Sequence, residues 1–348
     1  MEANKELSVG LVLLCLSLGN LGATRAAAAA DRPPAEIYKT ICVACHEGAV
    51  PRAPHSVEFQ MLGPRTILTA LESGVMQAQG ALLTPTERRA IAEHLAGAAL
   101  PAEQAAPHAS CDAAHSRFDF NRPPPLAGWA MTLEGTRHVS AKAAGLRAAD
   151  VPRLELKWAF AFPGATRARS QPTVGGGALY VGSQDGTIYA IDFATGCVRF
   201  TFAADAEVRS SPVLEPWRSG DRTAKPKLWF GDFKGNAYAL DAQSGALLWK
   251  TRVDEHPRLT ITGSPRYYDG RLYVPMSSNE WAAAANPAYE CCTFRGGVAA
   301  LDAATGALAW RSYSIPQAPQ ATGEVNASGA ARLHPAGAGA DHTDALLG

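Results

Sequence analysis

The sequence lacks an excess of charge of either sign. Lys and Arg together number 32, and so do Asp and Glu. A chain without net positive charge has no general electrostatic attraction for nucleic acid or for an acidic membrane surface. Neither is therefore expected as a partner.

Long apolar runs are also scarce. The run Val9–Leu18 ends at Gly19, well short of the about 20 residues that a membrane-spanning helix needs. Lys5 precedes it and small alanines follow it at 26–30, which is the pattern of a secretory signal peptide. We therefore expect residues 1–30 to be a signal peptide and the mature chain to have no transmembrane segment.

A zinc site would use a second pair of ligands close to Cys42 and Cys45 in the sequence, and none follows nearby. Together with His46 these two cysteines form C-x-x-C-H, the pattern of a c-type haem attachment site. The two thiols would bond the haem and the imidazole would bind its iron. In bacteria this attachment is made outside the cytoplasm, so the motif agrees with export and indicates the periplasm.

Residues 31–100 are predicted to form an α-helical cytochrome c domain. Helices are expected at 35–43 and 65–72, the second from its apolar residues at helical spacing. A third should run from Thr84 to about Leu95, because Thr84, Pro85 and Glu87 have the spacing of a helix start.

The sixth ligand of a haem iron would be Met or His. A resemblance to class I cytochromes c favours Met76, which precedes the last helix, while Met61 and His55 remain alternatives. Met76 as an ordinary core residue is also left open.

Residues 101–117 are rich in Ala and Pro without periodicity, which is typical of a linker. Outside the predicted signal peptide, which contains Cys15, the cysteines that remain once the paired ones are set aside are Cys111 and Cys197. A bond between them is an option in an oxidising compartment, but the sequence leaves the pairing open.

From Leu154 onward the chain repeats two alternating strands followed by an Asp-x-x-[Thr/Ser]-Gly turn and, four residues after the glycine, an aromatic side chain. The turns begin at Asp192, Asp241 and Asp302, and the aromatics are Phe200, Trp249 and Trp310. Four short strands per repeat are typical of a β-propeller blade. The repeats resemble those of pyrroloquinoline quinone dehydrogenase propellers, and this resemblance implies that the aromatics dock between neighbouring blades. A β-sandwich would not account for the repeated turn.

The third repeat contains an insertion with two adjacent cysteines, Cys291 and Cys292. Their Cα atoms lie about 3.8 Å apart across a trans peptide, below the usual disulfide span of about 4.4–6.8 Å. A bond between them would be strained, and strain of this kind occurs at functional sites. Two reduced thiols are the alternative.

These features together resemble the polyvinyl alcohol dehydrogenase family, quinohaemoproteins that carry pyrroloquinoline quinone (PQQ) and haem c. The resemblance rests on the haem motif placed before the propeller, on residues 156–164 and on residues 290–296. It implies an all-β propeller of PQQ-dehydrogenase type at 118–348, eight-bladed in that family. It also implies a disulfide of Cys291 and Cys292 against PQQ, and Glu280 as a calcium ligand.

The implied activity is oxidation of secondary alcohol groups of polyvinyl alcohol to ketones in the periplasm. Electrons would pass from PQQ to haem c and then to a soluble cytochrome c-type acceptor. Two alternatives stay open: an electron-transfer cytochrome fused to a propeller scaffold without catalysis, and a PQQ dehydrogenase for another alcohol or a sugar.

The resemblance fails at the C-terminal end. Residues 118–348 are enough for about four or five blades, so the propeller is incomplete and the chain is interpreted as a C-terminally truncated member of the family. The family's catalytic Asp base and the Asn of its calcium site would lie beyond residue 348. No catalytic residue is therefore assigned, and a truncated chain is expected to be inactive.

Overall fold

The computed structural model describes residues 31–335 with these exceptions: 48–49, 51–52, 101–107, 126–128, 130–135, 137, 164, 166 and 287. The predicted signal peptide at 1–30 lies outside the described residues. Within the described part of the chain, no helix combines the length and the apolarity needed to cross a membrane.

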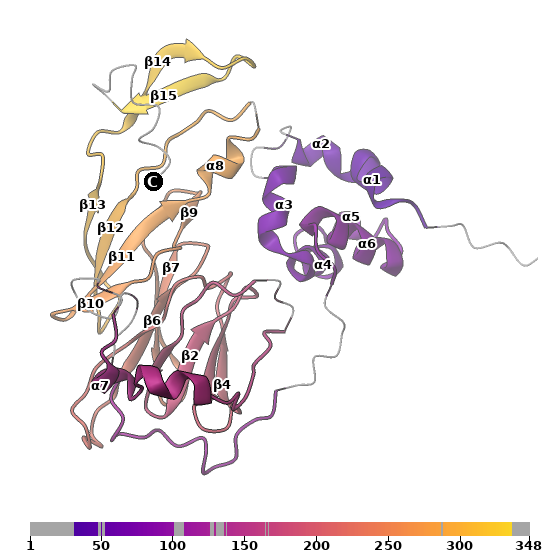
Figure 1. Cartoon of the computed structure of the whole chain (residues 1–348). Helices are drawn as coiled ribbons and strands as arrows, with labels where there is room; N and C mark the ends of the chain where they lie inside the picture. The colour runs from indigo at the N-terminus through magenta and orange to yellow at the C-terminus, as the bar shows by residue number, and fades with distance from the viewer. Residues whose placement is uncertain are drawn as a thin grey trace, which may run out of the picture. The chain divides into compact units, whose positions relative to one another are not determined.

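Helices occupy the N-terminal part of the described chain (Figure 1). They are α1 (Pro34–Ile37), a π-helical turn (Tyr38–Cys42), α2 (Val43–His46), α3 (Ser56–Leu62), α4 (Pro64–Glu72), α5 (Gln77–Gly80) and α6 (Pro85–Ala96). The helices predicted at 65–72 and 84–95 are confirmed to within the usual uncertainty of helix ends. The segment predicted as one α-helix at 35–43 is helical, but a π-helical turn separates its two α-helical parts and the helix continues to His46. The helices pack around one apolar core that includes Ile37, Phe59 and Ile91.

The start of α6 shows why the sequence signal was reliable. The hydroxyl of Thr84 accepts a hydrogen bond from the Glu87 amide at 3.1 Å, and the Glu87 carboxylate accepts one from the Thr84 amide at 3.0 Å. Both bonds satisfy amides that the helix itself leaves unpaired. Glu87 also pairs with Arg32, whose Nε lies 2.7 Å from Oε1.

Three antiparallel sheets follow, each with its four strands in chain order (Figure 1). The first contains β1 (Thr173–Gly175), β2 (Ala178–Gly182), β3 (Thr187–Asp192) and β4 (Val198–Ala203). The second contains β5 (Val213–Leu214), β6 (Lys227–Gly231), β7 (Asn236–Asp241) and β8 (Leu247–Arg252). The third contains β10 (Arg266–Tyr268), β11 (Arg271–Ser278), β12 (Gly297–Asp302) and β13 (Leu308–Tyr313), and β9 (Leu259–Thr260) pairs beside β11.

The remaining elements are α7 (Ala141–Ala144), a 3-10 helix (Ala148–Arg153), α8 (Glu280–Ala283) and the hairpin of β14 (Pro319–Val325) and β15 (Ala331–Pro335). Four-stranded meanders in chain order are blades of a propeller, so the predicted blade architecture is confirmed. The described residues form three such sheets and one hairpin, fewer than the four or five blades expected from chain length.

The repeated turn has the same bonding in each blade. Asp192 Oδ1 accepts hydrogen bonds from the Thr195 amide at 2.9 Å and from the Thr195 hydroxyl at 2.8 Å. Asp241 and Asp302 bind the equivalent residues of their turns in the same way. The glycine that closes the first turn, Gly196, has φ 77°, a conformation in which other residues are strained.

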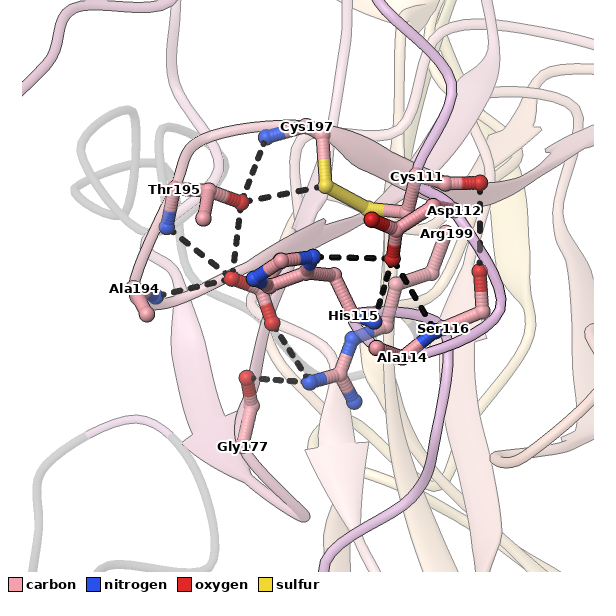
Figure 2. The surroundings of a disulfide bond; sticks show 11 residues. Cys111, Asp112, Ala114, His115, Ser116, Gly177, Ala194, Thr195, Cys197 and Arg199 are labelled. Carbon is pink, nitrogen blue, oxygen red and sulfur yellow. Dashed lines mark hydrogen bonds and ion pairs between the residues drawn. A yellow bond between two sulfur atoms is a disulfide. The ribbon is translucent and has the colours of Figure 1, made fainter.

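Part of the predicted linker is attached to the first sheet. Cys111 is bonded to Cys197, with their Cα atoms 5.1 Å apart (Figure 2). Beside the disulfide, the Cys111 amide donates to Val198 O and the Val198 amide donates to Ala109 O, both at 2.9 Å. Residues 109–111 therefore pair with the start of β4 and are not a free tether, whereas residues 101–107 lie outside the described chain.

Candidate functional site

The C-x-x-C-H motif lies on helical structure. Cys42 ends the π-helical turn, and Cys45 and His46 belong to α2. Both cysteines are half-buried and neither is in a disulfide. His46 is 6% exposed. Two free thiols and a buried imidazole are thus brought together within about one helical turn.

The tautomer of His46 follows from its partner. Its Nδ1 lies 2.7 Å from the carbonyl oxygen of Pro54. Because a carbonyl only accepts, Nδ1 must carry the hydrogen, which leaves the lone pair on Nε2. A ring nitrogen anchored in this way is the usual arrangement of a metal-ligating histidine.

The candidates for a sixth ligand differ in their surroundings. Met76 is half-buried against the helical core, directly before α5. Met61 lies in α3 and is also half-buried. His55 is already engaged, since its Nε2 lies 2.9 Å from Glu47 Oε2. The geometry therefore favours a methionine and does not decide between the two.

The second candidate site is the insertion of the third blade, between β11 and β12. Glu280 begins α8 and is 2% exposed. Its Oε1 accepts hydrogen bonds from the Thr293 amide at 2.7 Å, the Tyr289 hydroxyl at 3.0 Å and the Thr293 hydroxyl at 3.1 Å. Its Oε2 accepts one from the Phe294 amide at 2.8 Å. One buried carboxylate thus holds both ends of the segment 289–294.

A histidine continues this network. His256 Nε2 lies 2.9 Å from the Thr293 hydroxyl, and its Nδ1 accepts a hydrogen bond from the Arg258 amide at 3.2 Å. Nε2 is therefore the protonated nitrogen of the neutral ring and donates to Thr293, which donates in turn to Glu280. Burial lowers the pKa of His256 and so favours this neutral form.

Tyr289 is the other side chain on Glu280. Burial, together with the charge and the hydrogen bond of that carboxylate, raises the pKa of Tyr289 to about 12. The tyrosine thus stays a neutral hydrogen-bond donor at physiological pH.

Cys291 and Cys292 lie in the segment that Glu280 holds. They are joined in a disulfide, their peptide bond is cis, and both are half-buried. The carbonyl of Cys291 accepts a hydrogen bond from the Leu333 amide of β15 at 3.1 Å. The disulfide is therefore fixed by α8 on one side and by the C-terminal hairpin on the other.

The predicted role of Glu280 in a calcium site does not fit its surroundings. Calcium takes six to eight oxygen ligands, but four hydrogen bonds from the chain itself occupy this carboxylate. No group of three or more His, Cys, Asp or Glu side chains suited to a metal occurs among the described residues. These residues do not form a calcium site by themselves.

Sequence reasoning missed Thr293, His256 and the contribution of β15. Thr293 follows the cysteine pair directly. Its hydroxyl, next to a loop that was expected to be strained, could have marked it as a residue of the site. His256 precedes the third sheet and has no motif around it, so nothing in the sequence connected it with the insertion.

Comparison with known proteins supports the assignment of the repeats. The model of the family PQQ_2, described as "Outer membrane protein assembly factor BamB", matches residues 129–328, more than half of the chain. A polyvinylalcohol dehydrogenase of Sphingopyxis sp. is 37% identical over 301 residues, which cover 82% of this chain and 45% of the relative.

Two further relatives have related names. A polyvinylalcohol dehydrogenase of Pseudomonas sp. is 36% identical over 344 residues, which are 94% of this chain and 52% of the relative. A quinohemoprotein alcohol dehydrogenase of Comamonas testosteroni is 29% identical over 178 residues, 50% of this chain and 24% of the relative. The chain spans about half the length of the polyvinylalcohol dehydrogenases that it matches.

Proposed function

The chain belongs to the PQQ_2 family, and on this basis we propose that it is the haem-binding and quinone-contacting portion of a periplasmic quinohaemoprotein alcohol dehydrogenase. Its substrates would be secondary alcohol groups, with polyvinyl alcohol as the first candidate because two relatives are named for that substrate. Electrons would leave through haem c to a soluble cytochrome acceptor.

One observation carries the proposal. The chain combines free Cys42 and Cys45, next to a histidine whose lone pair lies on Nε2, with a half-exposed disulfide of adjacent cysteines in a blade insertion. A haem motif alone fits any cytochrome, and a propeller alone fits many functions.

The residues of α2 suit a haem. Cys42 and Cys45 would form its thioether bonds, and His46 would bind the iron through Nε2 while Pro54 holds the ring in place. Met76 or Met61 would supply the second iron ligand from the protein. The haem, when bound, takes up and passes on single electrons.

The insertion of the third blade suits a planar cofactor. The disulfide of Cys291 and Cys292 offers a fixed, half-exposed apolar surface, and Glu280 holds that surface in place through Thr293 and Phe294. PQQ, when bound, accepts the hydride of the alcohol. No residue of the chain is assigned as the base, and calcium is not assigned to Glu280 for the reason given above.

The first experiment tests the haem. The chain is produced in bacteria with a c-type haem maturation system, and covalent haem is measured on denaturing gels and by the pyridine haemochrome spectrum. Cys42→Ser with Cys45→Ser should abolish it, and Cys111→Ser with Cys197→Ser should keep it. Haem that stays bound after the first double substitution would contradict the assignment.

The second experiment tests the quinone. Equilibrium dialysis with PQQ should show saturable binding that Cys291→Ser with Cys292→Ser weakens at least tenfold, a change of about 1.4 kcal/mol. Dye reduction with polyvinyl alcohol in a relative of full length, with and without PQQ, tests the substrate separately. The absence of saturable PQQ binding to this chain would remove the quinone from the proposal.

A scaffold function is the second candidate, because the matching family model is described as an assembly factor. It predicts covalent haem without PQQ binding. The dialysis experiment therefore separates the two candidates.

A further inference from the structure

His256 contacts the insertion of the third blade from a loop outside it. It lies between β8 and β9, and the residues that it contacts, Thr293 and Phe294, belong to the segment that carries the disulfide. Its ring meets the ring of Phe294 edge to face, with the centroids 5.2 Å apart. One side chain from outside the insertion thus contacts the two residues whose amides bind Glu280.

Both ring nitrogens of His256 form hydrogen bonds, one as donor and the other as acceptor. Nε2 donates to the Thr293 hydroxyl at 2.9 Å, and Nδ1 accepts from the Arg258 amide at 3.2 Å. Because the Thr293 hydroxyl accepts from His256, its own hydrogen is directed to Glu280 Oε1, 3.1 Å away. Only the neutral ring can donate at one nitrogen and accept at the other. Protonation would place a hydrogen on Nδ1, opposite an amide that also donates.

The surroundings of the ring contain charges of both signs. The titratable and charged groups are, from its own loop, Asp254, Arg252 and Arg258 and, from the insertion, Glu280 with the Tyr289 that donates to it. Burial is the largest influence and lowers the pKa of His256. The carboxylates oppose this effect and the guanidinium groups add to it, and the pKa lies below its ordinary value. The neutral ring is therefore the form that the folded chain favours.

We propose that His256 is a positioning residue of the quinone site. The neutral ring directs the Thr293 hydroxyl to Glu280 and so holds the segment that carries Cys291 and Cys292. A proton on the ring abolishes this arrangement and releases the segment, so the affinity of the site for PQQ falls at acidic pH. The connection with PQQ rests on the proposed function, whereas the hold on the segment is a property of this chain alone.

The pH range follows from the direction of the pKa shift. When the segment opens, the ring of His256 is exposed to water and its pKa returns to about 6.5, whereas in the held segment it is lower. The hold is therefore strongest above pH 6.5 and weakens as the pH falls below that value. From pH 7.5 to 5.5 the open population should rise at most about tenfold, which is the limit for a held ring that stays neutral throughout.

Hydrogen exchange of the chain without PQQ tests the hold. The protection factors of the Thr293 and Phe294 amides, corrected for intrinsic exchange, should fall about three- to tenfold from pH 7.5 to 5.5. His256→Gln presents a donor and an acceptor but does not titrate, so it should keep the protection and abolish its pH dependence. His115→Gln changes an exposed histidine bonded to Asp112 and should leave the wild-type profile unchanged. A pH dependence that persists in His256→Gln would overturn the proposal.

A double-mutant cycle tests the route through Thr293. His256→Phe keeps a ring against Phe294 but loses both hydrogen bonds, and should lower the protection of the Phe294 amide about three- to tenfold at pH 7.5. Thr293→Val removes an exposed hydroxyl and should have a similar effect. The double variant should lose little more than either single variant, and effects that simply add would overturn the proposal. Should the histidine variants not fold, Thr293→Val with the full wild-type pH dependence would also overturn it.

Equilibrium dialysis with PQQ distinguishes a failure of this role from a failure of the proposed function. Saturable binding should weaken about three- to tenfold from pH 7.5 to 5.5 in the wild type and should stay constant in His256→Gln. Equal pH dependence in both proteins would overturn the role of His256 and leave the quinone assignment intact. The absence of PQQ binding at both pH values would refute the proposed function, while hydrogen exchange would still decide whether His256 holds the segment.

Discussion

Replacing Glu280 by Gln should release the segment that carries Cys291 and Cys292. The wild-type carboxylate accepts at both oxygens, from the Thr293 amide and from the Phe294 amide. A glutamine has one acceptor and one donor at the same two positions. In either orientation its NH₂ group faces an amide that also donates, so at least one buried hydrogen bond is lost.

The size of the effect follows from the charge and the burial. A hydrogen bond to a charged group contributes about 1.5–3 kcal/mol, and a buried donor left without a partner costs a similar amount. We expect the free energy of opening of this segment to fall by about 2–3 kcal/mol. At about 1.4 kcal/mol for each factor of ten, this is roughly a 30- to 150-fold increase in the open population.

Hydrogen exchange measures this directly. The amides of Thr293 and Phe294 should exchange roughly 30 to 150 times faster in Glu280→Gln, while amides of β6 and β7 should keep their rates. Glu290→Gln is the matched control, because Glu290 belongs to the same insertion and is exposed. Unchanged exchange in Glu280→Gln would refute the idea that this carboxylate holds the loop.

Further predictions concern the rest of the chain. Serine at both Cys111 and Cys197 should lower the free energy of unfolding by about 4 kcal/mol, because the disulfide closes a long loop; urea unfolding that matches the wild type would contradict this. The hydrogen bond from Arg32, followed by that from the Thr84 amide, lowers the pKa of Glu87 to about 2. Its folded pKa thus lies below its unfolded value of about 4.3, so this contribution is present above pH 4.3 and is lost as the pH falls towards 2. Unfolding followed by circular dichroism at a series of pH values should show this loss of stability between pH 4.3 and 2. Glu87→Gln should abolish this pH dependence and lower the stability at pH 7. Calcium at 1 mM should change the free energy of unfolding by less than about 0.5 kcal/mol, because four hydrogen-bond donors of the chain occupy Glu280. A larger stabilisation by calcium that magnesium does not reproduce would contradict the conclusion that Glu280 is not a calcium ligand.

The predictable parts of the fold are those whose signal is local. In the turn at Asp192 the carboxylate binds Thr195 and the chain reverses at Gly196. All interactions that form this turn therefore lie within five consecutive residues. The start of α6 is similar, because Thr84 and Glu87 bind each other across one turn. Repetition then showed that the turns belong to blades.

The unpredicted parts depend on residues that only the tertiary structure brings together. Glu280 and Thr293 are joined across an insertion without periodicity, so the sequence suggested an acidic ligand where the structure has a carboxylate that binds its own loop. Cys111 and Cys197 are 86 residues apart, and their pairing requires that the predicted linker lie along β4. Among the described residues there are fewer blades than chain length suggested, because the described part of 118–172 contains no strand.

The attachment of residues 109–111 also bears on how this chain avoids sticking to itself. β4 is the outermost strand of its sheet, and an outermost strand offers unpaired amides and carbonyls to any other extended chain. The amides of Cys111 and Val198 already form hydrogen bonds between residues 109–111 and β4, and the disulfide keeps these residues attached to the strand. Reducing agents should therefore uncover the edge of β4 and allow it to pair with strands of other molecules. The redox state of this one disulfide thus controls the tendency of the first blade to aggregate.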